Sequence, residues 1–94
     1  MEKLYEVAKI HTRRFPNGND PYKIITRILE ECGEVASEVN HFERSGIKCQ
    51  KHGEPSKQKL ADEIKQSMSC LCQLIQYYGI EEEFEKSIDN SLNK

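Results

Sequence analysis

Apolar residues recur at intervals of three and four between positions 24 and 42, and this pattern constrains the fold more than any other feature of the sequence. The series comprises Ile24, Ile25, Ile28, Leu29, Cys32, Val35, Ala36, Val39 and Phe42. Such spacing gathers side chains along one side of a helix of about five turns. Asp20 followed by Pro21 is typical of an N-cap and a first helical residue, and Ser45-Gly46 is expected to end the helix.

Three other segments carry apolar residues with helical spacing. In residues 2–14 they are Leu4, Val7, Ala8 and Ile10. In residues 57–78 they form a stripe that we expect to enter the core, made of Leu60, Ile64, Met68, Leu71, Ile75 and Tyr78. Ser56 is predicted to cap the start of this helix and Gly79 to stop it. A last helix is predicted over residues 81–94, which place apolar residues four apart at Phe84, Ile88 and Leu92.

The segment between the two long helices, residues 46–58, is expected to be a loop. It contains two Gly and one Pro, has no apolar period, and is locally basic, with Lys48 and Lys57 among its cations. Long loops in small domains are often functional. No segment has the alternation of a strand. The sequence therefore predicts an all-α helical bundle of three to four helices per chain, forming one domain over residues 1–94.

The size of the chain suggests that its core is completed by a second copy. The chain has 94 residues, of which 36% are hydrophobic, and it contains no Trp. A domain this small buries a smaller share of its surface than a larger one does. Chains with so few core residues often complete the core by pairing with a copy of themselves. We therefore expect a homodimer or homotetramer.

Charge and hydropathy exclude several classes of protein. The formal net charge is −2, whereas nucleic-acid binders carry a strong basic excess, so no nucleic-acid partner is expected. The longest unbroken apolar runs are two or three residues, far short of the roughly 20 that span a bilayer. The N-terminal segment MEKLYEVAKIH lacks the apolar stretch of a secretory signal. These features predict a cytoplasmic protein with no membrane partner.

The cysteines are predicted to be reduced thiols with a packing role or none. Cys70 and Cys72 are separated by one residue, whereas zinc and redox motifs usually separate their cysteines by two. Cys32 stands at the centre of an apolar stripe, where a free Cys packs as a small hydrophobe. The sequence therefore does not favour a disulfide or a zinc site.

A row of carboxylates follows the edge of the apolar stripe in residues 28–39. Each helical residue advances by about 100°, which aligns Glu31, Glu34 and Glu38 in one column and places Glu30 further round. Carboxylates three residues apart point the same way and can share a hard cation such as Mg²⁺. For the row alone a solvated helix face is the better explanation, since many helices carry Glu there.

The next helix adds further carboxylates. Asp62 and Glu63 lie near its start, in the segment KLADEI, where they can approach the row on the preceding helix. Acids from two neighbouring helices can surround one or more Mg²⁺ ions, or Mn²⁺, together with the phosphates of a bound ligand. This second group of acids favours a metal site over a solvated face.

The segments ILEECGEVASEV, KLADEI and YYGIEEEF resemble the all-α nucleoside triphosphate pyrophosphohydrolases, and the MazG-like members in particular. The family pattern is E-E-x-x-E on one helix and E-x-x-D on the next. Glu30, Glu31 and Glu34 match the first motif, and Asp62 matches the last acid of the second. On the last helix, the Lys/Asn/basic pattern of the family is matched by Lys86, Asn90 and Lys94. The resemblance covers residues 24–94.

The resemblance implies a reaction and a site. The reaction is hydrolysis between the α and β phosphates of a nucleoside triphosphate, which releases a monophosphate and pyrophosphate. Metal ligands would be Glu31, Glu34 and Asp62, with Glu63 as a substitute ligand, and Glu30 or Glu38 would orient the attacking water. Candidates for contacting the substrate are Lys48, Lys57, Lys59, Lys86 and Asn90, and an aromatic side chain such as Phe15 or Tyr77 is a candidate to stack on the base. The family also implies a dimer or tetramer.

One position departs from the family pattern. Lys59 stands where E-x-x-D has its first acid, and a protonated lysine cannot ligate a metal. Glu63, one turn later, could supply the missing oxygen, Lys59 could contact a phosphate, the site could bind fewer ions, or it could have lost activity. The alternative functions are a catalytically silent helical module that binds a nucleotide or a protein, and a plain coiled-coil adaptor.

Overall fold

The computed structural model describes residues 1–43 and 53–93. Within these ranges the chain forms four α-helices, one short 3₁₀ turn and no strand: α1 (Glu2–Arg14), η1 (Pro16–Gly18), α2 (Pro21–Phe42), α4 (Lys57–Tyr78) and α5 (Glu81–Leu92). The prediction of an all-α chain with up to four helices is confirmed. Most of the predicted loop, including Lys48, lies outside the described residues, as does Ser45-Gly46.

The helix ends follow from local side-chain chemistry. The Asp20 carboxylate accepts a hydrogen bond from the backbone N–H of Lys23 at 3.0 Å, which caps α2. The Ser56 hydroxyl accepts one from the backbone N–H of Lys59 at 3.1 Å, which caps α4. Gly79 ends α4 in the left-handed region, at φ +64° and ψ +38°. All three caps were predicted from the sequence and are confirmed.

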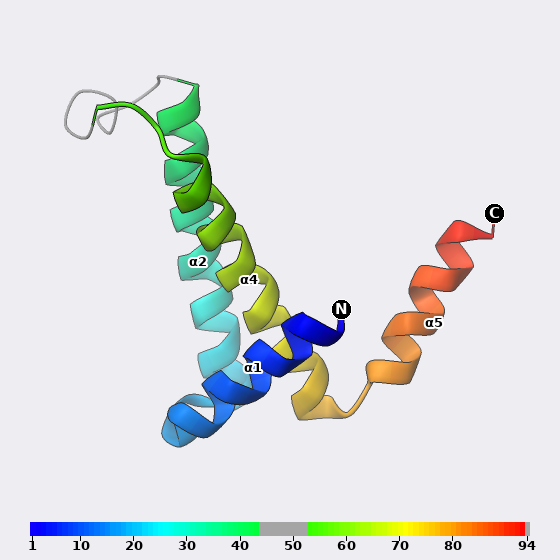
Figure 1. The fold of residues 1–94 in the computed structure, drawn as a ribbon. Coiled ribbons are helices and arrows are strands. Elements are labelled where there is room, and N and C mark those ends of the chain that lie inside the picture. Colours follow the sequence, from blue (N-terminus) through cyan, green and yellow to red (C-terminus); the bar gives the residue numbers. More distant parts are fainter. Residues whose placement is uncertain (44–52, 94) are drawn as a thin grey trace.

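The two long helices form an antiparallel hairpin (Figure 1). α2 and α4 lie side by side along their length, and α1 packs across α4 near the end of the hairpin where α2 begins. α5 follows α4 after a tight turn and projects away from the hairpin (Figure 1). None of the described helices combines the length and the apolar character that crossing a bilayer requires.

The buried residues of the single chain differ from the predicted core. The buried apolar residues are Ala8, Ile24, Cys70, Cys72 and Ile75, and the buried polar ones include Ser69 and Gln73. Of the stripe predicted on residues 57–78, Ile64, Met68, Leu71 and Tyr78 are between 41% and 58% exposed. On α2, Leu29 is 69% exposed and Cys32 is also exposed. The expectation of burial is therefore wrong for these exposed residues in the single chain, whereas Ile24 and Ile75 of the same stripes are buried.

The reason is the side on which the two helices meet. α2 turns Ile24, Arg27 and Glu31 toward α4, and this side lies next to its apolar stripe. In an antiparallel pair, stripes offset in the same rotational sense from the contact line end on the same face. The hairpin thus presents one broad apolar face, which comprises Ile25, Leu29, Cys32 and Val39 of α2 with Ile64, Met68, Leu71 and Tyr78 of α4.

Candidate functional site

Glu31 and Glu63 meet where α2 and α4 pack together. Both side chains are half-buried, and a side-chain hydrogen bond joins them. Partial burial raises the pKa of Glu31 above its ordinary value, and the charge of Glu63, this hydrogen bond and the charges of Glu34 and Glu30 raise it further. Each of these effects disfavours the charged form of Glu31, so a proton or a cation at this pair would relieve the repulsion.

The other predicted acids lie around this pair. Glu30 and Glu34 are exposed on α2. Glu30 directly precedes Glu31, and Glu34 follows it by about one turn. Asp62 is exposed beside Glu63, and its Oδ1 accepts a hydrogen bond from Nε2 of Gln58 at 2.9 Å. These residues come from the two motif-bearing segments, which the hairpin brings side by side.

Glu38 differs from the other acids in its burial. It is 2% exposed, and it lies seven residues beyond Glu31, or about 10 Å further along α2. His41, one turn later, is also buried, and its Nε2 is 2.5 Å from the backbone oxygen of Gly53. Glu38 thus belongs to the packed end of the hairpin, whereas the Glu31–Glu63 pair is nearer its middle.

The described carboxylates around Glu31 and Glu63 are too few to enclose a metal ion by themselves. They would suit a Mg²⁺ ion that a bound phosphate also ligates better than an ion held by protein alone. Within residues 1–43 and 53–93, no three His, Cys, Asp or Glu side chains are grouped closely enough to enclose a metal. Mg²⁺ is commonly bound through one or two carboxylates, with water and phosphate oxygens completing its octahedral shell. Glu31 and Glu63 could supply two such carboxylates, because they interact across the packed helices.

Basic side chains gather around His11 and Arg27. Arg27 precedes Glu31 by one turn, and its Nη2 donates to Oδ1 of Asn19 at 3.2 Å. Its Nε is buried and has no hydrogen-bond partner among the described residues. Burial lowers the pKa of His11, and the nearby charges of Arg14, Lys65 and Arg27 lower it further. A group of cations with a neutral imidazole among them suits a phosphate ligand.

Sequence reasoning did not identify His11 and Lys65 as site residues. The spacing of Arg27 to Glu31 is visible in the sequence, because residues four apart lie on the same helix face. His11 and Lys65 belong to other helices, and only the packing of α1 against α4 brings them near Arg27. No local pattern in the sequence signals that proximity.

The predicted substrate contacts are spread over the chain. Lys57 and Lys59 are exposed in the first turn of α4, and Lys59 precedes Glu63 by one turn. Lys86 and Asn90 are exposed on α5, which projects away from the hairpin (Figure 1). The single chain therefore places Lys59 on the helix of the acid pair, whereas Lys86 and Asn90 stand on a separate arm.

No protein-family model, no curated protein and no solved structure matches this chain. The likeness to the MazG-like pyrophosphohydrolases therefore rests on the motif residues themselves. Of those residues, Glu30, Glu31, Glu34 and Asp62 occupy adjacent turns of two packed helices.

Proposed function

We propose that the chain is a Mg²⁺-dependent nucleoside triphosphate pyrophosphohydrolase, with Mn²⁺ as the alternative ion. It would cleave the α–β phosphoanhydride of a (deoxy)nucleoside triphosphate to a monophosphate and pyrophosphate, acting on the cytoplasmic nucleotide pool. The observation that carries the proposal is the contact between the carboxyl groups of Glu31 and Glu63. A divalent cation would relieve the repulsion of this pair while leaving positions open for phosphate oxygens.

The surrounding residues have distinct roles in this proposal. Glu31 and Glu63 hold the ion, with Glu34 and Asp62 as outer ligands. When bound, the ion neutralises phosphate charge and activates water. Substrate phosphates are bound by Arg27, Lys59 and Lys65, with His11 as a neutral hydrogen-bond donor. Glu30 orients the attacking water, because Glu38, the other acid predicted for this role, is buried about 10 Å further along α2. Lys48, Lys57, Lys86 and Asn90 contact phosphate or nucleotide.

The proposed enzyme is a homodimer or a pair of such dimers, formed through the apolar face. The radius of gyration is 15.7 Å, whereas a compact domain of this length has about 12 Å. The accessible surface is 6955 Å², whereas a folded monomer of 10.9 kDa exposes about 5600 Å². The excess exceeds the roughly 800 Å² that each partner buries in a standard interface. A second copy packed on the apolar face would account for both the large radius of gyration and the excess exposed surface.

The test is release of pyrophosphate from a panel of ribo- and deoxyribonucleoside triphosphates in Mg²⁺. We expect at least one substrate to give pyrophosphate and monophosphate in equal amounts. Glu31→Gln keeps the shape of the side chain but removes its charge, and it should lower the rate by at least about 100-fold. Glu83→Gln, at an exposed position on α5, is the matched control and should retain full activity.

The apolar face also favours a second candidate, a catalytically silent protein-interaction module. Exposed apolar area on both long helices is typical of a partner-binding surface. The same experiment separates the two functions. If no triphosphate yields pyrophosphate while circular dichroism shows a folded helical protein, the hydrolase proposal fails and the interaction module is the better explanation.

A further inference from the structure

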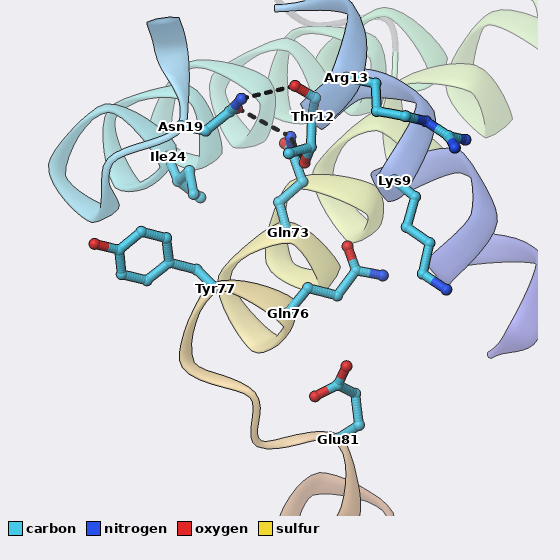
Figure 2. Close-up of a pocket in the computed structure, with 9 residues that line it drawn as sticks. All are labelled: Lys9, Thr12, Arg13, Asn19, Ile24, Gln73, Gln76, Tyr77 and Glu81. Atoms are coloured by element: carbon cyan, nitrogen blue, oxygen red, sulfur yellow. Dashed lines mark hydrogen bonds between the residues drawn. The ribbon is translucent and has the colours of Figure 1, made fainter. Parts of the chain in front are cut away.

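A hollow of about 430 Å³ lies at the end of the hairpin where α2 begins and α4 ends (Figure 2). Its walls come from α1, the residues after η1, the start of α2, the end of α4 and the start of α5. This volume lies within the range of small-molecule sites. The side chains that determine its chemistry are Lys9, Thr12, Arg13, Gln73, Gln76 and Tyr77.

Hydrogen bonds hold the polar side chains of this hollow in place. Gln73 is 3% exposed, and its Nε2 donates to Oγ1 of Thr12 at 3.0 Å and to Oδ1 of Asn19 at 3.4 Å. Nδ2 of Asn19 donates to the backbone oxygens of Thr12 at 3.0 Å and Phe15 at 2.7 Å. Nε2 of Gln76 donates to the backbone oxygen of Tyr5 at 3.0 Å. The amides are thus ordered before any ligand arrives, which lowers the entropy cost of binding.

The two ends of the hollow differ in character. At one end the ring of Tyr77, which is 54% exposed, extends beneath the buried side chain of Ile24 (Figure 2). At the other end Lys9 and Arg13 project from α1, and Glu81 lies on the α5 side (Figure 2). The Lys9–Glu6 ion pair is long, at 3.8 Å, and exposed, so it competes weakly for the Lys9 ammonium group. From the Tyr77 end to the Lys9 end, a ligand would meet first an aromatic ring, then side-chain amides, and last a group with net positive charge.

This hollow is separate from the Glu31–Glu63 pair. Gln73 lies ten residues beyond Glu63 on α4, a separation of about 15 Å along the helix. On α1, Lys9 and His11 point to opposite sides of the helix, about 160° apart. Lys9 lines the hollow, whereas His11 lies near Arg27 and outside the lining.

We propose that this hollow binds a nucleoside monophosphate, as a flat heteroaromatic ring carrying one anionic group. The ring stacks on Tyr77 against Ile24, the amide of Gln76 meets its hydrogen-bonding edge, and Lys9 and Arg13 bind the phosphate. The buried amide of Gln73 holds Thr12 and Asn19 in place behind this site. Its partners are an aromatic ring, amides and cations, so binding requires no metal. The site does not depend on the chemistry proposed for the acid pair.

The test is titration of the full chain with AMP, GMP, CMP and UMP in EDTA, followed by NMR. At least one should bind saturably and shift the side-chain amide signals of Gln73 and Gln76. Tyr77→Ala should weaken binding about tenfold through lost stacking. Arg13→Ala should weaken it about threefold to tenfold through the lost charged contact, reduced by its exposure. Both positions are exposed, so the helical circular dichroism of each variant should match the wild type.

Three controls make the outcome decisive. Tyr22→Ala and Arg14→Ala remove the same residue types from exposed positions outside the hollow, and they should leave affinity unchanged. Glu31→Gln should also bind normally, which separates this site from the proposed hydrolase centre. The proposal is overturned if no monophosphate binds in EDTA, if Tyr77→Ala binds as tightly as the wild type, or if binding is lost in Glu31→Gln.

Discussion

The carboxyl group of Glu31 on α2 is hydrogen-bonded to that of Glu63 on α4, so the two long helices meet through a pair of acids. In most helix pairs such a half-buried position is apolar, because an ionised carboxylate loses hydration there. Without a bound cation, the contact destabilises the charged form of Glu31 and raises its pKa. The packing of this hairpin is therefore linked to the protonation of Glu31.

Replacing Glu31 with Gln should stabilise the metal-free chain at neutral pH. A carboxyl group whose pKa is raised on folding costs stability as the pH rises from its unfolded value, near 4.5, through its folded value. Gln removes this cost, which for like-charged neighbours is about 0.5 kcal/mol, or roughly 2–4 °C in Tm. The measurement is thermal unfolding of Glu31→Gln and wild type in EDTA at pH 7 and pH 4.

The difference between the two proteins should disappear at pH 4, because Glu31 is then protonated in the folded wild type. Glu83→Gln removes a carboxylate from an exposed site on α5 and should change Tm little at either pH. A Glu31→Gln protein that is less stable than wild type at pH 7 would show that the carboxylate contributes favourable contacts, contrary to this account.

Mg²⁺ should raise the Tm of the wild-type chain. A ligand that binds only the folded state stabilises it by about 2.7 kcal/mol at 100 times its Kd. Glu63→Gln should lose most of that rise, because it removes one of the two interacting carboxylates. The measurement is thermal unfolding across a MgCl₂ series at constant ionic strength, with Glu83→Gln as the control. Equal Mg²⁺ responses in Glu63→Gln and wild type would mean that the ion binds elsewhere.

The ends of the helices could be predicted because their causes are local. Asp20, Ser56 and Gly79 each act on backbone groups within four residues, and each does so in the structure. The all-α class followed equally directly from apolar spacings of three and four. The carboxylate row could be placed on one helix face for the same reason, since position on a helix depends only on the residue interval.

The pairing of the helices could not be predicted because it depends on distant residues. Apolar spacing gave the stripe on α2 correctly. It did not show that α4 would pack against the side of α2 that carries Glu31, next to that stripe. Leu29 and Leu71 were expected in the core and are 69% and 47% exposed. The choice of Glu63 as the partner of Glu31 depends on the register of the hairpin, which no interval within one helix determines.

Gly79→Ala should destabilise the chain. Gly79 ends α4 at φ +64°, a conformation that costs a residue with a side chain about 1–2 kcal/mol, and no heavy atom would obstruct the added Cβ. The loss of Tm should be about 4–8 °C per kcal/mol. Chemical denaturation gives the free energy directly. Gly33→Ala is the matched control, because Gly33 lies within α2 with open space around it, and it should stabilise the helix.

A charge on the apolar face should separate the proposed dimer into monomers. Leu29 is 69% exposed in the single chain, and an interface there would bury it against the second copy. Leu29→Lys would bury an unpaired ammonium group, at a cost of several kcal/mol, which exceeds what a small interface can tolerate. Light scattering after gel filtration should give a wild-type mass at least twice 10.9 kDa and a monomer for the variant. Glu6→Lys, on the exposed side of α1, should remain a dimer, and a dimeric Leu29→Lys would refute this interface.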